Sequence, residues 1–378
     1  MKRIVVSWLI MALILIPSIA FAYDGNGKEQ RSDYLVMFDG PANKGLFKAF
    51  GVQDQDIIHE YDLLDVVQLN LTTNQATALK NHPQIKFVEE NAEVSAYGQA
   101  VPWGVPHVQG TAGHDLGFTG NGVKVAILDT GIDNTHEDLA ANVKGGHSVF
   151  TDAANLDPFY DEDGHGTHVA GTVAAINNDL GVLGVAHQAD LYAVKVLNNS
   201  GSGSYAGIAA GIEWAIQNDM DIVNMSLGGS QSSAILKEFC DLAYAEGLLV
   251  VAAAGNEGNR GGNNDTVGYP AKYDSVIAVA AVDQNNNRPT FSSTGPAVEL
   301  AAPGANILST TPNNRYAAYN GTSMASPHVA GVAAQILEAK PTLSNVEVRE
   351  LLRLSAKDLG NSRQFGYGLV QTVDAIQY

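Results

Sequence analysis

The sequence contains a single cysteine, Cys240, in 378 residues. No intramolecular disulfide can therefore form, and the stability of the fold must come from other interactions. The stretch around Cys240, AILKEFCDLAYAEG, repeats apolar residues at helical spacing. We expect this cysteine to be a small, buried hydrophobic side chain.

Positive charge is also scarce. The chain has 21 Lys and Arg against 40 Asp and Glu, a formal net charge of -19, and no cluster of basic residues. Nucleic-acid binding is disfavoured, because phosphate contacts need grouped Lys and Arg. An acidic surface suits solubility and cation binding. Repeats and low-complexity linkers are absent too, while 45% hydrophobic and 16% charged residues argue against disorder.

Long apolar runs are few, and the one at the N-terminus has a recognisable pattern. A basic start (MKR) precedes an apolar run at 4–16 and a small-residue site, AFA, at 20–22. A membrane anchor is the alternative, since 4–22 spans 19 residues, but Pro17 and Ser18 interrupt the run. We expect residues 1–22 to be a cleaved signal peptide, which predicts a secreted protein without stable membrane association.

Glycine is scarce between 23 and about 97, and this segment reads as a small α+β unit. Strands are predicted at 34–38, 66–71 and 85–90, with a helix opened by a threonine cap in TTNQATALKNH. The length of the chain supports one further, larger unit.

From about 120, apolar strands alternate with helices. Strands are predicted at 123–129, 191–197, 221–226, 248–255 and 276–282, and helices at about 165–175, 205–218, 232–246, 323–338 and 344–356. This alternation indicates an α/β fold, a mostly parallel sheet with helices on both faces. Ligands bind such sheets beyond the carboxyl ends of the strands.

Polar residues lie at or just beyond the ends of two of these strands. Asp129 ends the strand VKVAILD, and Asn256 follows VVAAAG in a glycine-flanked turn. Either residue alone could simply shape a turn. As functional groups, Asp129 would orient a base and Asn256 would offer an amide to an oxyanion.

His165 opens a predicted helix and shares one helical face with His168. The pair could be two packed histidines or a metal pair, although zinc helices usually carry H-E-x-x-H and no Glu lies between these two. A histidine in the first helical turn near a strand-end Asp is also well placed as a general base.

Ser323 lies at or just inside the start of the helix at 323–338, where we expect Pro327 to be tolerated in the first turn. Serine is a common helix cap, so this stretch alone does not make it a nucleophile. An acid, a base and an oxyanion donor elsewhere on the same sheet would complete that role.

Five strings carry a family resemblance: ILDTGID, HGTHVAGTVAA, NMSLGG, VVAAAGNEG and GTSMASPHVAG. They resemble the subtilisin-like serine peptidases, secreted enzymes with a signal peptide and an inhibitor-type propeptide, and the match runs from VPWGVPHVQ at 101 to the C-terminus. The order Asp129, His165, Ser323 is the one that characterises subtilisins. The resemblance implies the subtilisin-like three-layer fold and a monomeric serine endopeptidase acting on proteins and peptides.

The resemblance also implies roles. Ser323 attacks the scissile carbonyl, His165 transfers the proton, Asp129 fixes the imidazole tautomer and Asn256 binds the oxyanion, while His168 is structural. Two edges bind the substrate strand: Gly201, Ser202, Gly203 and Tyr205, and Ser226, Leu227 and Gly228. The pocket for the residue before the cut is formed by Ala253, Ala254, Gly255 and Gly268. It should favour large apolar or aromatic side chains, and Glu257 at its rim could accept a lysine.

Structural calcium is implied in the same way. Six positions match the strongest calcium site of the family: Gln99, Asp138, Ile176, Asn178, Leu180 and Val182. Their carbonyl, amide and carboxylate oxygens suit Ca²⁺. The loop between Asp129 and His165 is slightly longer than in the best-known members, and its Asp152, Asp157, Asp161 and Asp163 could form a second cation site or only a solvated loop.

Residues 23–97 resemble the family's propeptide, a folding chaperone and inhibitor. The strings YLVMF and VEENAEVSAY carry this resemblance, and Tyr97/Gly98 would be the junction cut by the enzyme itself. We therefore expect a signal peptide at 1–22, a propeptide at 23–97 and a catalytic domain at 98–378.

Three rival readings remain to be tested. An α/β-hydrolase would need a catalytic histidine after the serine in the sequence. The only candidate is His328, and because it lies five residues further along the same predicted helix, its side chain cannot turn back to reach Ser323. A catalytically silent binding module and a metallohydrolase built on His165 and His168 are the others. A serine-directed probe and chelation distinguish them from a serine peptidase.

Overall fold

The structure is a computed structural model that describes residues 31–91 and 98–378. The chain divides into two compact units, 1–96 and 97–378, which we describe separately. The predicted signal peptide and Tyr97 of the predicted junction lie outside the described residues.

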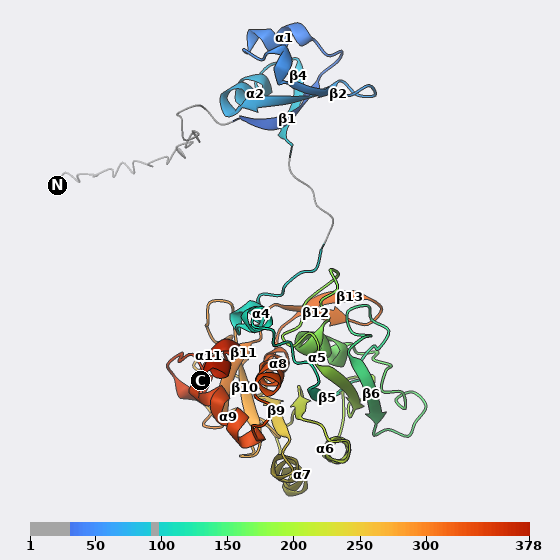
Figure 1. Cartoon of the computed structure of the whole chain (residues 1–378), viewed down its shortest axis with the longest axis vertical. Helices are drawn as coiled ribbons and strands as arrows, with labels where there is room; N and C mark the ends of the chain where they lie inside the picture. Colours follow the sequence, from blue (N-terminus) through green and yellow to red (C-terminus); the bar gives the residue numbers. More distant parts are fainter. Residues whose placement is uncertain (1–30, 92–97) are drawn as a thin grey trace, which may run out of the picture. The chain divides into compact units, whose positions relative to one another are not determined.

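The first unit is a four-stranded antiparallel sheet with helices (Figure 1). Its strand order is β2-β3-β1-β4, and its core includes Val36, Leu69 and Leu79. The elements are β1 (Arg31–Phe38), α1 (Lys44–Ala49), the 3-10 helix η1 (Asp54–Asp56), β2 (Ile57–Glu60), β3 (Val66–Thr72), α2 (Thr73–Lys80) and β4 (Ile85–Glu90).

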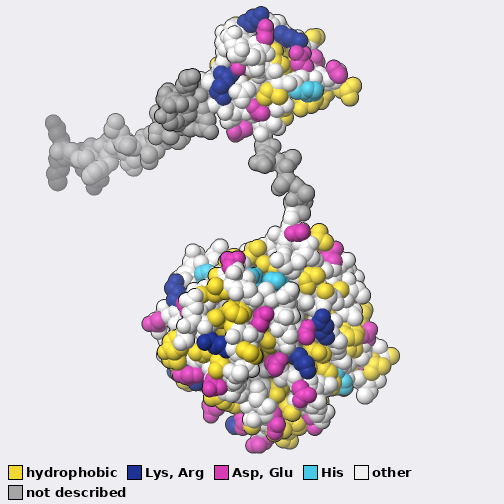
Figure 2. All heavy atoms as spheres, in the orientation of Figure 1, with side chains coloured by type: hydrophobic (Ala, Val, Ile, Leu, Met, Phe, Trp, Pro, Cys, Tyr) yellow, Lys and Arg dark blue, Asp and Glu magenta, His cyan; other side chains and the backbone are white. Residues whose placement is uncertain are grey.

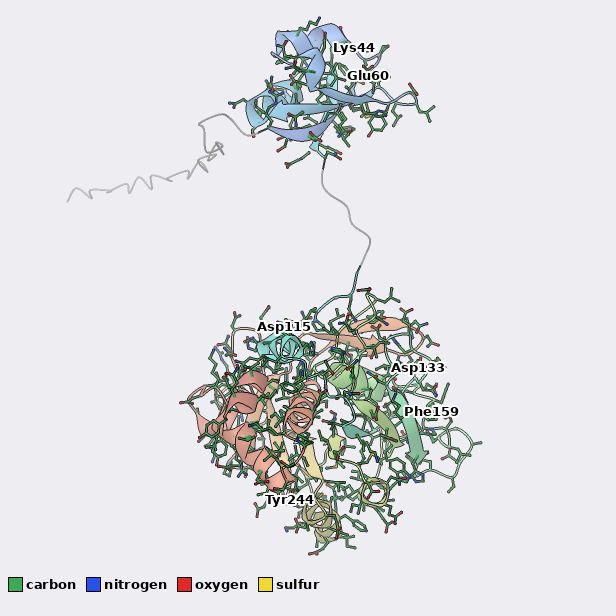
Figure 3. All side chains as sticks on the ribbon, viewed as in Figure 1. Lys44, Glu60, Asp115, Asp133, Phe159 and Tyr244 are labelled. Atoms are coloured by element: carbon green, nitrogen blue, oxygen red, sulfur yellow. The ribbon has the colours of Figure 1, made fainter. Side chains whose placement is uncertain are left out.

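The predicted strands and threonine-capped helix of this unit are present. Thr72 is the N-cap of α2, and its hydroxyl accepts a hydrogen bond from Gln75 N at 3.2 Å. The short elements α1 and β2 were not predicted from the sequence. Lys44 of α1 and Glu60 of β2, labelled in Figure 3, form an ion pair at 2.8 Å between two exposed side chains.

The second unit is built on a seven-stranded parallel sheet of order β11-β10-β9-β8-β5-β7-β6, as the alternating pattern predicts. Strand β5 lies inside the sheet, where it pairs with β7 on one side and β8 on the other. The strands are β5 (Lys124–Asp129), β6 (Val143–Ser148), β7 (Asp190–Lys195), β8 (Ile222–Met225), β9 (Leu249–Ala253), β10 (Ile277–Val282) and β11 (Val298–Pro303), with a hairpin of β12 (Ile307–Thr311) and β13 (Arg315–Tyr319).

Helices cover both faces of this sheet (Figure 1). Val125 and Ile127 belong to the core with α5 and α8, whereas Ala126 and Leu128 belong to the core with α6 and α7. The helices are α3 (Gly104–His107), α4 (Gly110–Asp115), α5 (His165–Ala174), α6 (Tyr205–Gln217), α7 (Ala234–Ala245), α8 (Thr322–Ala339), α9 (Asn345–Leu354), α10 (Ser362–Phe365) and α11 (Thr372–Gln377).

The sequence did not predict β6, β11 or the β12–β13 hairpin. Strand β6, VKGGHS, contains two glycines and lies at the edge of the sheet, so its apolar signal is weak. In β11 the buried Glu299 interrupts the apolar pattern. Its carboxylate charge is balanced by an ion pair with Arg349 of α9, in which Nη2 lies 2.5 Å from Glu299 Oε2. Such tertiary pairing cannot be read from a local pattern.

Acidic side chains are dispersed over the face of the second unit seen in Figure 2, where Lys and Arg form only small groups. Cys240 is fully buried in α7, as expected, and burial raises the pKa of its thiol to about 12. Within 31–91 and 98–378, no helix combines the length and the apolar character needed to cross a membrane.

Candidate active site

Four predicted site residues lie where strands end or helices begin. Asp129 is the last residue of β5, and Ser226 and Asn256 follow β8 and β9. His165 is the first residue of α5. Because parallel strands end at one edge of the sheet, the fold brings these side chains to the same edge.

Asp129 and His165 are directly hydrogen-bonded. His165 Nδ1 lies 2.8 Å from Asp129 Oδ1, which also accepts the Thr130 amide at 2.8 Å. The Asp129 side chain is 1% exposed, whereas that of His165 is 26% exposed. The second carboxylate oxygen, Oδ2, is buried and accepts no hydrogen bond from the described residues. The bond through Nδ1 leaves His165 Nε2 free to exchange protons.

The surroundings of His165 favour its charged form. Burial lowers the pKa of the imidazole, but the Asp129 carboxylate, with smaller effects of Asp163 and Asp161, outweighs it and raises the pKa to about 9. A neutral His165 able to accept a proton therefore becomes abundant only in alkaline solution.

Ser323 is the second residue of α8. Its hydroxyl donates to Ser226 O at 3.1 Å, and none of the hydrogen bonds between described residues joins it to His165. Catalytic hydrogen bonds are often absent until substrate is bound, so this geometry is compatible with a nucleophile.

The expectation for Pro327 was wrong. Helix α8 begins at Thr322, so Pro327 is in the second turn and not the first. There it removes the amide that would bond to the Ser323 carbonyl. The Ser226 hydroxyl replaces it, donating to Ser323 O at 2.7 Å. Ser226 thus holds both the backbone and the hydroxyl of Ser323.

Asn256 is oriented by the residue before Ser323. Its Oδ1 accepts the Thr322 amide at 3.0 Å and the Thr322 hydroxyl at 3.2 Å. Because Oδ1 accepts these bonds, Nδ2 is the remaining donor, and Asn256 lies in the wall of a pocket together with Ser323. An amide donor beside the serine is suited to binding an oxyanion.

Two connected pockets form a cleft. The first, about 820 Å³, is lined by His165 and by all seven residues predicted for the two substrate edges. The second, about 430 Å³, is lined by Ser323, Asn256, Ala253, Gly255 and Gly268. The pockets share Leu227, Gly228 and Gly229, so the cleft is continuous.

The second pocket differs in detail from the sequence expectation. Ala254 is fully buried behind the wall, where its carbonyl accepts the Gly268 amide at 3.0 Å. Glu257 does line the pocket. The ion pair between Asp265 and Lys272, at 2.7 Å, is a further part of the lining that the sequence did not suggest.

His168 does not contribute to the cleft. It is fully buried, its Nε2 lies 3.0 Å from Ile307 O and 3.1 Å from Ala317 O, and its ring stacks on Tyr319 with centroids 4.3 Å apart. Burial lowers its pKa to about 4. The histidine connects α5 to the β12–β13 hairpin.

The four aspartates of the loop before His165 have separate roles. Asp152 bonds to Asn155, and Asp157 accepts the Phe159 amide at 2.9 Å. Asp161 is buried and accepts hydrogen bonds from Thr130, Gly164 and Thr167. Asp163 lines the cleft. In the described part of the chain, no group of three or more His, Cys, Asp or Glu side chains is arranged to hold a metal.

The six residues predicted to bind calcium lie together. Gln99 Nε2 is 2.5 Å from Ile176 O, 2.8 Å from Val182 O and 3.5 Å from Asn178 Oδ1. Asp138 bonds to Asn178 Nδ2 and to the Val182 amide, and the Leu180 amide donates to Asn178 Oδ1. Ile176 O, Val182 O and Asn178 Oδ1 therefore gather around the Gln99 side-chain amide, where Nε2 donates to them. Oxygens of these types are the ligands that a hard cation prefers.

A parallel sheet with an Asp–His pair and a helix-start serine at one edge is the arrangement of a serine peptidase. The sequence profile described as "Subtilase family" matches residues 120–368. The chain is 45% identical to subtilisin E of Bacillus subtilis over 98% of both chains. It is 51% identical to alkaline elastase YaB of a Bacillus species, over 91% of this chain and 87% of that one, and 44% identical to the thermostable alkaline protease of Halalkalibacterium halodurans, over 97% and 98%.

The chain therefore belongs to the subtilase family and is a subtilisin-type serine endopeptidase with the subtilisin fold. Membership of this family excludes the α/β-hydrolase and the metallohydrolase as descriptions of the protein. The similarity to subtilisin E extends through the N-terminal region.

Proposed function

We propose that the enzyme cleaves peptide bonds through an acyl-enzyme on Ser323, with His165 as general base, Asp129 as its orienting acid and Asn256 as oxyanion donor. The observation that carries this assignment is the 2.8 Å bond between Asp129 and His165 at the sheet edge that also holds the Ser323 helix start. A fluorophosphonate tests it: the probe should label Ser323, in the presence of a chelator as well.

In acylation, Ser323 Oγ bonds to the scissile carbonyl carbon while its proton passes to His165 Nε2. The oxyanion is held by Asn256 Nδ2 and by the Ser323 amide at the positive end of α8. The carbon–nitrogen bond then breaks as His165 returns the proton to the leaving amine. Water, deprotonated by His165, releases the acyl group by the same route.

Replacing Asn256 by leucine should lower turnover and leave the Michaelis constant nearly unchanged, because the amide acts on charge that develops in the transition state. The expected loss, about 10²–10³-fold, is the one associated with this position in subtilisin and does not come from the present geometry. Steady-state kinetics on a peptide substrate measure it. A large rise in the Michaelis constant with intact turnover would contradict the role.

The specificity follows from the two pockets. A substrate strand would lie between 201–203 and 226–228 and add to these edges by main-chain hydrogen bonds. The residue before the cut would enter the pocket with Gly268, where the absence of a side chain leaves room for a large apolar or aromatic group. Glu257 would also accept lysine there. Cleavage-site profiling on a peptide library tests this preference.

Activity should rise with pH. The pKa of His165 is about 9, and the protonated imidazolium cannot act as a base, so kcat/KM should increase tenfold per pH unit below pH 9 and level off above it. The names of two relatives, an alkaline elastase and an alkaline protease, agree with this direction. A kcat/KM profile from pH 6 to 11 measures this rise on the acid side, the acid limb of the profile. A plateau reached by pH 7 would contradict the expectation.

We propose that Ca²⁺ is bound by Gln99, Asp138, Asn178 and the carbonyls of Ile176, Leu180 and Val182. The convergence of Ile176 O, Val182 O and Asn178 Oδ1 on Gln99 supports this site. The loop follows α5, so the ion would hold it and the segment around Gln99 in place. These residues do not line the catalytic cleft.

Chelation should therefore shorten the lifetime of the enzyme and leave its chemistry intact. A ligand that binds only the folded state stabilises it by ~2.7 kcal/mol at a hundredfold excess over its dissociation constant. We expect an unchanged initial rate after chelator addition, a shorter half-life at raised temperature and faster self-digestion. Asp138→Ala should have the same effect, whereas Asp115→Ala, which alters an exposed carboxylate at the end of α4, should not.

Two outcomes would contradict this expectation. Immediate loss of the initial rate with chelator would indicate a catalytic metal. A half-life that is independent of calcium from micromolar to millimolar concentrations would show that the site has no stabilising role.

The N-terminal region supports a maturation pathway. We propose that 1–22 is a signal peptide for secretion, that 23–97 is a propeptide that assists folding and inhibits the enzyme, and that Ser323 cuts the Tyr97/Gly98 junction. The full-length similarity to subtilisin E and the separate unit of 31–91 support this division. The released enzyme would act as a monomer on proteins and peptides outside the cell.

A further inference from the structure

One fully buried side chain beside the catalytic pair is a lysine. Lys195 is the last residue of β7 and is paired in register with Asp129 at the end of β5. Among the described Lys and Arg residues, only Lys195 and Arg349 are buried, Lys195 completely, and Arg349 is paired with Glu299. Lys195 forms no carboxylate ion pair within the described residues. A buried ammonium without such a partner requires a local reason.

The ammonium of Lys195 contacts two backbone carbonyls. Nζ donates to Thr130 O and, at 3.3 Å, to Tyr160 O. Thr130 follows Asp129, and Tyr160 belongs to the loop that leads to His165, a loop marked by Phe159 in Figure 3. Lys195 therefore connects the segment of the catalytic acid to the segment before the base.

Thr130 uses its polar atoms in the same network. Its amide donates to Asp129 Oδ1 and its hydroxyl donates to Asp161 Oδ1, both at 2.8 Å. The hydroxyl also accepts the Gly166 amide of α5 at 2.9 Å. A displacement of the Thr130 carbonyl would therefore move both Asp129 and the first turn of α5.

The charges around the pair are predominantly negative. The buried Asp129 Oδ2 accepts no hydrogen bond from the described residues, and Asp161 is buried as well. The groups that interact electrostatically with His165 or Lys195 come from β5, from the loop before α5 and from α5 itself: Asp129, Asp157, Asp161, Asp163 and the neutral His168. Lys195 is the basic group among them: burial lowers the pKa of its ammonium, and the surrounding carboxylates oppose this effect.

We propose that Lys195 is a positioning residue of the catalytic pair: its ammonium holds the Thr130 and Tyr160 carbonyls together and offsets the negative charge around Asp129. The offset keeps His165 neutral, and thus able to act as a base, at lower pH than the carboxylates alone would allow. This inference rests on the proposed catalytic roles of Asp129 and His165.

The test compares Lys195→Gln with Lys195→Met in the mature enzyme. Glutamine retains a hydrogen-bond donor and loses the charge, whereas methionine loses both. If the charge matters, both variants move the acid limb of the kcat/KM profile upward by about half a pH unit or more, the scale of one removed charge near a partly buried site. Loss of activity at all pH values with an unmoved limb would leave only a structural role and would overturn the proposal.

A second pair of variants covers the case in which Lys195→Gln does not fold, since it leaves Asp161 uncompensated. Asp161→Asn should move the acid limb of the kcat/KM profile to lower pH. The double variant Lys195→Gln/Asp161→Asn should have its acid limb at higher pH than Asp161→Asn alone. These two proteins differ only in the charge at Lys195, so identical limbs would overturn the proposal.

The unaltered enzyme separates this inference from the proposed function. If it hydrolyses peptides with a single acid limb and a fluorophosphonate labels Ser323, the assigned roles hold and the variants test Lys195 alone. If it fails both, the proposed roles of Asp129, His165 and Ser323 are wrong.

Discussion

Replacement of Ser323 by alanine is expected to abolish peptide hydrolysis and to leave the chain as an uncut precursor. The oxygen that bonds to the scissile carbon is removed, and the same oxygen is proposed to cut the Tyr97/Gly98 junction. The loss in turnover known for this serine in subtilisin is about 10⁶-fold, a value from that enzyme and not from this geometry. The apparent mass of the purified chain on a denaturing gel shows whether the precursor is cut, and an assay on a peptide substrate measures the loss of hydrolysis.

The matched control is Ser326→Ala, one turn along the same helix. Ser326 is buried and its hydroxyl donates to Asn224 Oδ1 at 2.6 Å, so its loss should affect stability and not processing. Normal maturation of Ser323→Ala with no other peptidase present would show that the junction is not cut by this serine.

Replacement of Asp129 by asparagine should lower kcat by about 10⁴-fold, the loss known for the corresponding substitution in a trypsin-type peptidase, with little change in the Michaelis constant. An amide at this position can donate a proton to His165 Nδ1, which would stabilise the tautomer with the proton on Nε2, the wrong one for a base. Asparagine has nearly the same shape as aspartate, so the 2.8 Å contact with His165 can be kept while its hydrogen-bond direction is reversed. Steady-state kinetics at pH 7 to 11 measure the loss.

Asp115→Asn provides the control, because Asp115 is an exposed carboxylate at the end of α4, labelled in Figure 3. It should keep full activity. An Asp129→Asn enzyme with more than a tenth of the normal kcat would show that His165 does not depend on this carboxylate.

Local patterns predicted much of the fold. Strand β5, KVAILD, and helix α5, HGTHVAGTVA, were found within one or two residues because their apolar spacing is periodic and glycines bound them. The hairpin β12–β13 was missed because its strands are polar or only half-buried, and it is held by contacts from α5 such as His168.

The candidate site was predictable for a different reason. Asp129, His165 and Ser323 each lie within two residues of a glycine and at a strand end or helix start, so their positions in the elements could be read from short motifs. The sequence could not reveal that Ser226 replaces the amide lost at Pro327, since the two residues come from different elements.

The sequence by itself determined the alternation of strands and helices, the order of the catalytic residues and the family, because these depend on local spacing and short motifs. Only the tertiary structure decided which polar atoms meet. Lys195 reads as one more residue of the strand LYAVKVL, yet its ammonium reaches the carbonyl of Thr130, 65 residues earlier. Parallel strands bring distant chain segments together, so the charge balance around Asp129 and His165 exists only in the folded protein.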